Sequence, residues 1–138
     1  MFGFIKRKEE KKQKDQAFYH AQLWRSDPRL QECFSALRGW FTVALAMHQE
    51  AAEATISIAN AESGWVCADA FADDWLAQKV FVLWSEPTLP VLQVDRDELL
   101  KKLASVITVA PETYLVSETF DRVVHFRADG SIELYSVA

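Results

Sequence analysis

Cysteine is scarce in this chain of 138 residues, and its scarcity excludes several kinds of site. The two cysteines, Cys33 and Cys67, lie far apart among apolar neighbours and form no CxxC or Cys…His spacing. A disulfide scaffold needs more cysteines, and a structural zinc site needs closely spaced pairs of ligands. We therefore expect two buried free thiols in a reducing compartment, with no metal and no other cofactor.

Glycine and histidine are also sparse, which argues against the common catalytic and phosphate-binding motifs. No two of the four glycines are close enough for a GxGxxG or a P-loop, and no GxSxG is present. The histidines form no HExxH or HxH; they are His20, His48 and His125. We interpret His48 and His125 as structural side chains of a helix and a strand. A small enzyme with an unrecognised site, built on His48, Cys67 or the Asp73–Asp74 pair, stays open as an alternative.

Long hydrophobic runs are also missing. A membrane-spanning helix needs about 18 uncharged apolar residues, and the longest uncharged run, residues 39–49, is much shorter. No apolar stretch follows the first positive charges, as it would in a secretory signal. These features predict a cytoplasmic protein.

What the chain does have is an uneven charge. Residues 1–14 carry a net charge of +4, whereas the other 124 residues carry −9, and the two give the overall −5. We interpret residues 1–14 as a basic, flexible leader. The leader has three readings: a solubilising tail, a segment that folds back on the acidic body, or a weak contact with an anionic membrane or nucleic acid. The membrane contact would use Phe2, Phe4, Ile5, Lys6, Arg7 and Lys8. The acidic body itself should repel nucleic acid and attract basic partners.

The first half of the chain has mainly helical patterns. A short helix is predicted over 15–25, and Asp27 with Pro28 then begins a second, long helix. Its apolar residues recur in steps of three and four from Leu30 to His48, so we predict one helix from 28 to 52 or beyond. Trp40, Val43 and Met47 widen its apolar face.

Beyond residue 52 the pattern is ambiguous. We favour a hairpin of 54–60 with 65–69, and the alternative is a helix that continues to about residue 61. Another short helix is predicted at about 70–78.

The second half alternates like a sheet. Strands are predicted over 79–84 and 91–94, and a helix over 96–106 that begins with a capping box of Asp95 and Glu98. A three-stranded antiparallel meander follows over 113–119, 122–127 and 131–137. The prediction is therefore a single α+β domain, residues 15–138, with N-terminal helices packed on a mostly antiparallel sheet.

One stretch suggests a binding site, because acidic and aromatic residues alternate there and no basic residue occurs between Arg38 and Lys79. Its candidate partner-binding residues are Glu62, Trp65, Asp69, Phe71, Asp73, Asp74 and Trp75. Aromatic side chains anchor protein interfaces, and charges around them steer a partner of opposite sign. The competing interpretation is that the aromatic rings fill the core and the acids form a solvated rim.

These features together predict a small acidic protein that binds or inhibits a basic protein partner. A bacterial immunity protein that neutralises a cationic toxin is one concrete form. The alternatives are the small enzyme and a membrane-peripheral adaptor that uses the basic N-terminus.

Overall fold

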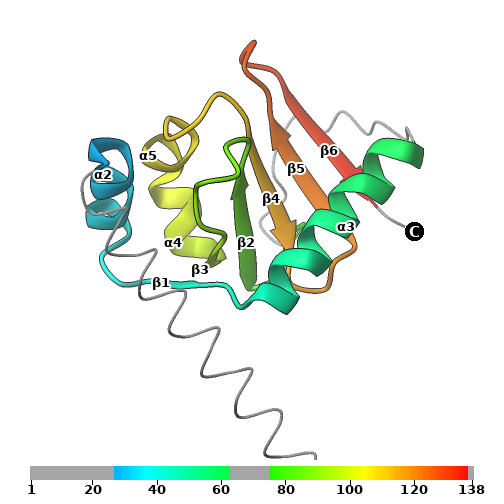
Figure 1. The fold of residues 1–138 in the computed structure, drawn as a ribbon, viewed down its shortest axis with the longest axis horizontal. Coiled ribbons are helices and arrows are strands. Elements are labelled where there is room, and N and C mark those ends of the chain that lie inside the picture. Colours follow the sequence, from blue (N-terminus) through cyan, green and yellow to red (C-terminus); the bar gives the residue numbers. More distant parts are fainter. Residues whose placement is uncertain (1–26, 63–74, 137–138) are drawn as a thin grey trace, which may run out of the picture.

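A computed structural model of the chain describes residues 27–62 and 75–136 (Figure 1). These residues form a six-stranded antiparallel sheet in the order β1-β3-β2-β4-β5-β6, with helices on both faces. The strands are β1 (Phe41–Val43), β2 (Lys79–Trp84), β3 (Leu92–Asp95), β4 (Thr113–Ser117), β5 (Arg122–Phe126) and β6 (Ile132–Ser136). The helices are α2 (Pro28–Leu37), α3 (Ala46–Glu62), α4 (Arg96–Lys101) and α5 (Leu103–Ile107). The predicted α+β class and antiparallel sheet are confirmed.

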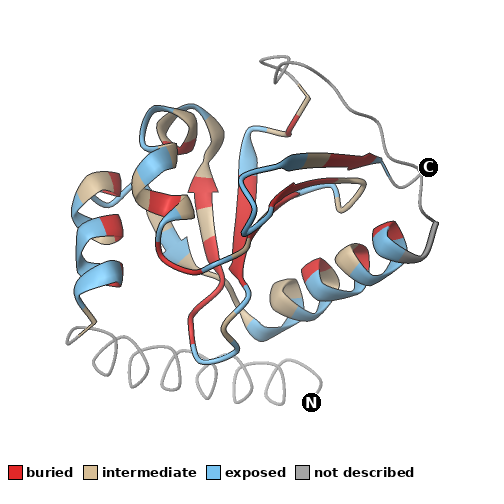
Figure 2. Ribbon diagram, turned by 90° about the horizontal axis from the view of Figure 1, so that it is seen from above, coloured by how far each residue is buried: buried red, intermediate tan, exposed pale blue. Residues whose placement is uncertain are grey.

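The helices divide into two layers. Figure 2 shows α2, α4 and α5 on one side of the strands and α3 on the other, with its buried residues turned toward the sheet. Successive side chains of a strand point to opposite faces, so β2 supplies both layers. Val80 and Val82 belong to the cluster under α2, α4 and α5, while Phe81 and Leu83 belong to the cluster under α3. This double burial explains why β2 is nearly all apolar.

The predicted long helix from 28 to 52 is wrong, because the chain leaves the helix after Leu37. Asp27 does cap α2, and Pro28 stands in its first turn, as expected. Arg38 (φ 48°) and Gly39 (φ 84°) then adopt left-handed conformations that end α2 and turn the chain. Residues 41–43 pair with β3 instead of continuing the helix.

The apolar periodicity misled because it continues across this turn. Phe41 and Val43 of β1 pack against the same core cluster as α2 does, and the ring of Phe41 stacks on Phe34 at 4.7 Å between centroids. A residue can thus keep a helical spacing from its neighbours while it belongs to a strand. Trp40 and Met47, predicted on the apolar face, are 56 % and 52 % exposed.

The predicted hairpin of 54–60 with 65–69 is also wrong in its first strand, because α3 extends to Glu62. The alternating Thr55-Ile56-Ser57-Ile58 is helical, and the hydroxyl of Thr55 donates to the carbonyl oxygen of Ala51 at 2.8 Å. Residues 65–69 and the predicted helix 15–25 lie outside the described residues. The predicted helix 70–78 lies mostly outside them, and its described end, residues 75–78, is not helical.

The second half agrees closely with prediction. Strand β2 has the predicted bounds, β3 is shifted by one residue, and the meander of β4, β5 and β6 is confirmed. The predicted helix 96–106 is instead two short helices, because Lys102 leaves helical geometry at φ −117°.

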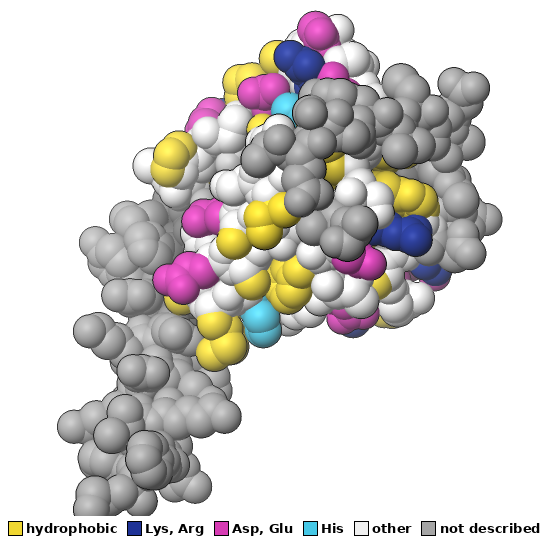
Figure 3. All heavy atoms as spheres, turned by 90° about the vertical axis from the view of Figure 1, so that its right-hand side faces the viewer, with side chains coloured by type: hydrophobic (Ala, Val, Ile, Leu, Met, Phe, Trp, Pro, Cys, Tyr) yellow, Lys and Arg dark blue, Asp and Glu magenta, His cyan; other side chains and the backbone are white. Residues whose placement is uncertain are grey.

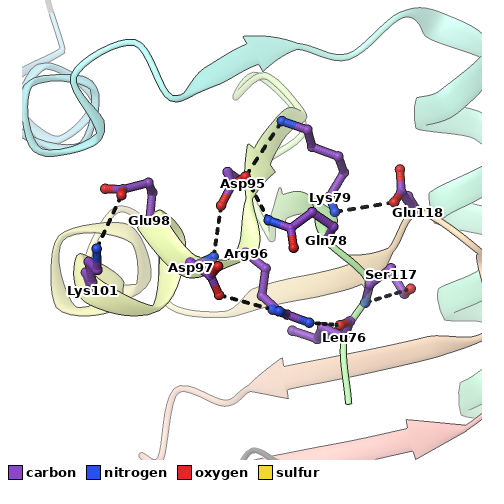
Figure 4. Close-up of polar contacts among 11 residues, drawn as sticks. Leu76, Gln78, Lys79, Asp95, Arg96, Asp97, Glu98, Lys101, Ser117 and Glu118 are labelled. Atoms are coloured by element: carbon purple, nitrogen blue, oxygen red, sulfur yellow. Dashed lines mark hydrogen bonds and ion pairs between the residues drawn. The ribbon is translucent and has the colours of Figure 1, made fainter. Parts of the chain in front are cut away.

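Figure 4 shows how polar contacts fix the start of α4. The carboxylate of Asp95 accepts from the backbone N–H of Asp97 at 3.1 Å and from the amide of Gln78 at 2.9 Å. Arg96 donates to the carbonyl oxygen of Leu76 at 2.8 Å. The side chain of Glu98, the expected reciprocal member of the capping box, contacts Lys101 instead.

Candidate protein-binding surface

Helix α3 is held on the sheet by the small residues of its inner face. Ala52, Thr55 and Ala59 are all buried, at most 5 % exposed, and Ala52 and Ala59 share a cluster with Phe81 and other apolar residues of the sheet. The ring of His48 lies 5.5 Å from that of Phe81. Because these inner side chains fix the rotation of α3, they also decide which residues its outer face presents.

The outer face of α3 exposes hydrophobic side chains. Met47 is 52 % exposed and Ile58 is 46 % exposed, and the chain between them supplies Ala51 and Ala54. These four residues are spaced by four, three and four positions, so they lie along one side of the helix. We call them the outer stripe. The remaining two large hydrophobic side chains that are exposed among the described residues, Trp40 and Ile132, lie on other elements.

Acidic residues accompany the outer stripe, and basic ones do not. Glu50 and Glu53 are exposed, and α3 contains no Lys or Arg. Within residues 27–62 and 75–136, neither carboxylate has an ion-pair partner. On the side of the molecule that carries α3, Figure 3 shows acidic and hydrophobic side chains next to one another. This face therefore combines apolar contact area with uncompensated negative charge.

The basic residues elsewhere are mostly neutralised. Arg29 of α2 contacts Asp27 and Glu86, both at 2.9 Å, and these contacts lower the pKa of both carboxyls. Arg127 of the β5–β6 turn contacts Glu133 at 2.8 Å. Negative charge is therefore left without a nearby cation on elements that lack Lys and Arg, and α3 is one of these elements.

The residues predicted to bind a partner are only partly within the described chain. Glu62 is the last residue of α3, so the predicted stretch begins where the outer face ends. Trp75 is half-buried and packs against the core. The other five lie outside the described residues, namely Trp65, Asp69, Phe71, Asp73 and Asp74. The predicted membrane contact, residues 2–8, also lies outside them.

Trp75 is held by an arginine rather than presented as a free anchor. The guanidinium of Arg122 lies 5.3 Å from the centre of the indole ring and donates to the carbonyl oxygen of Trp75 at 2.8 Å. A cation over an aromatic face is attracted by the ring quadrupole. For this one residue the structural interpretation, that the ring packs in the core, is the better description.

A cluster of polar side chains around His125 lies on the face of the sheet that carries α3. His125 is 7 % exposed, its ring stacks on Tyr114 at 4.1 Å, and its Nε2 lies 3.0 Å from a carboxylate oxygen of Glu112. Its Nδ1 is buried and has no hydrogen-bond partner among the described residues. The neighbouring Glu133 accepts from the hydroxyl of Tyr135 at 3.0 Å. Desolvation raises the pKa of both tyrosines above the ordinary value, so these phenols stay protonated.

Two other features of the described residues bear on chemistry, a pocket and a buried thiol. A shallow pocket of about 240 Å³ opens beside β1, and its polar lining consists of Thr42, Lys79 and Gln93 without a carboxylate or histidine. Burial raises the pKa of the Cys33 thiol to about 12, which leaves it a poor nucleophile. Across the described residues, no three His, Cys, Asp or Glu side chains are placed to share a metal ion.

No protein-family model matches the chain, and no curated protein matches it. Among the described helices, none combines the length and apolar character that crossing a membrane requires.

The outer stripe was not predicted from the sequence, because Met47 was expected to be buried. The available signal was the absence of any Lys or Arg from 46 to 62.

Proposed function

We propose that this protein binds a basic protein partner through the outer face of α3, continued along the chain by the predicted acidic and aromatic residues from Glu62 to Asp74. The observation that carries the proposal is that Met47 and Ile58 are about half exposed on a helix whose only charged side chains are acidic. Apolar side chains supply contact area, and unpaired carboxylates around them favour a cationic partner. A basic surface that carries apolar side chains of its own would complement this face.

The inhibitory role fits the same surface. A small acidic protein that covers the basic, substrate-binding surface of a toxin would block it without chemistry of its own. An immunity protein against a cationic toxin is therefore the concrete form we propose, and a toxin gene directly upstream of the coding sequence would support it. The same gene in a housekeeping operon would count against it.

The binding face is tested by two matched charge reversals. Glu50→Lys changes the outer face of α3, and Glu32→Lys makes the same change at an exposed glutamate of α2, on the opposite side of the sheet. Neither glutamate has an ion pair within the described chain, so we expect both variants to fold. Tagged wild type and both variants are used to capture proteins from cells of the native host.

We expect a basic protein that the wild type and Glu32→Lys retain and that Glu50→Lys loses. A steady-state titration with the purified partner should then show binding weakened about tenfold or more by Glu50→Lys, since like charges at an interface disfavour association. Equal loss in both variants would mean that only the net charge matters. Equal retention would remove α3 from the binding surface.

A further inference from the structure

Among the residues that the structure describes, strand β6 is one edge of the sheet. Within the described residues it pairs with β5 alone, and the backbone N–H of Arg127 donates to the carbonyl oxygen of Ser131 at 2.9 Å. Hydrogen-bonded and non-hydrogen-bonded pairs alternate in an antiparallel ladder. Ile132, Leu134 and Ser136 therefore occupy non-hydrogen-bonded positions opposite β5, and their N–H and C=O groups point away from it.

This edge lacks the usual protection against pairing. Natural sheets block their edges with proline, lysine, bulges or very short strands. Strand β6 contains no proline and no lysine, has an unbroken register with β5, and exposes 46 % of Ile132. The opposite edge, β1, is only three residues long. The single charge of β6, on Glu133, is compensated by Arg127 at 2.8 Å.

We propose that β6 pairs with β6 of a second copy of this chain, antiparallel, about a twofold axis through Leu134. In this register Leu134 faces Leu134 of the second copy, and Ile132 faces Ser136 of the second copy. All these residues have their N–H and C=O groups directed outward, so each pair can exchange two backbone hydrogen bonds.

Side-chain charge and the length of β6 favour this register over its two neighbours. An axis through Glu133 would set the two Glu133 side chains directly opposite each other, which is unfavourable. An axis through Tyr135 would pair Ile132 with residue 138, beyond the end of β6. The axis through Leu134 instead sets Glu133 opposite Tyr135 of the second copy. The hydroxyl of Tyr135 already donates to Glu133 within one chain at 3.0 Å, so the two side chains are compatible neighbours.

Disulfide trapping tests the register itself. Ile132 and Ser136 are both exposed, and they are four residues apart on one strand, too far for a disulfide within the chain. The double variant Ile132→Cys with Ser136→Cys should give a covalent dimer of twice the 15.7 kDa chain mass under mild oxidation. Each single variant and the wild type, which retain the native cysteines, should not. Equal cross-linking of a single variant and the double variant would overturn the register.

The free association is measured by sedimentation equilibrium of the uncross-linked protein. Ser136→Pro removes an N–H that points away from β5, so the ladder within the chain is kept, whereas Ser136→Ala keeps that N–H as the matched control. Because both copies carry the substitution, Ser136→Pro removes two hydrogen bonds from the dimer interface. We therefore expect about thirtyfold weaker dimerisation. A wild type that stays monomeric at its highest soluble concentration, or a Ser136→Pro that dimerises like Ser136→Ala, would refute the proposal.

Discussion

The rotation of α3 about its own axis can be tested with one substitution made at two positions of the helix. Ala52 is fully buried against the sheet, whereas Ala54 is exposed on the outer face. Ala52→Leu forces a larger side chain into a filled space, and such overpacking costs about 1–3 kcal/mol of unfolding free energy. Ala54→Leu adds the same atoms on the solvent side, where the change should stay within about 0.5 kcal/mol.

The comparison is informative because both variants share one helix and one change of helix propensity. Urea unfolding followed by tryptophan fluorescence gives the free energy of unfolding of each variant, and an unchanged slope with urea confirms that the two-state description holds. For a chain of this size, Ala52→Leu should also lower the melting temperature by about 3–9 °C. Equal destabilisation by both variants, or a neutral Ala52→Leu, would mean that a different face of α3 meets the sheet. The outer stripe would then not be the exposed surface.

Two further predictions concern helix ends. Arg38 and Gly39 both have positive φ, which strains any residue other than glycine. Arg38→Gly should therefore raise the free energy of unfolding in urea titrations by about 1 kcal/mol. Gly39→Ala should lower it by about 1 kcal/mol through backbone strain alone, because no described atom crowds the Cβ position of Gly39. Asp95→Ala should cost about 1 kcal/mol at neutral pH through loss of the α4 cap. The pKa of Asp95 is lowered in the folded state, mainly by the hydrogen bond from Gln78. The charged carboxylate therefore stabilises the fold above its unfolded pKa of about 3.9. This contribution is lost as the pH falls through the lowered folded pKa. Unfolding titrations of wild type and variant at a series of pH values should therefore converge at low pH; a gap that stays constant would assign the whole effect to something other than the ionised cap.

The strands could be predicted because their signals are local. The pleat of β2 to β6 makes alternate residues face alternate layers, and turns with aspartate or glycine separate the last three strands. The cap of α4 was found for the same reason, since Asp95 accepts from a backbone N–H only two residues away. Its expected partner Glu98 was not, because the competing contact with Lys101 depends on the rotamers of both side chains.

The helices were harder because tertiary contacts decided them. The spacing of Phe41 from Leu37 and Phe34 suits a helix, and Gly39 was the local signal that the helix ends before it. The pairing of Phe41 with Val94, more than fifty residues later, places it in the sheet. Conversely, the alternation of Thr55 to Ile58 resembles a strand, yet a run rich in alanine keeps helical geometry with Ala52 and Ala59 against the sheet. Within the predicted binding stretch, the structure describes Glu62 at the end of α3 and Trp75 packed against the core.

The charge distribution gives the proposed binding a kinetic consequence. The described residues contain eight Lys and Arg against fourteen Asp and Glu, and most of these cations already contact a carboxylate or a backbone carbonyl within the chain. The unpaired Glu50 and Glu53 are consequently left to attract a cationic partner from a distance, a force that salt screens over about 8–10 Å. The apolar outer stripe contributes only after contact, and salt affects it little. Association should therefore slow with rising salt, while dissociation changes less, and Glu50→Lys should flatten the salt dependence of association. If the salt dependence were found in the dissociation rate alone, the proposal would be contradicted. Charged pairs would then lie in the buried centre of the complex and the apolar contacts at its rim.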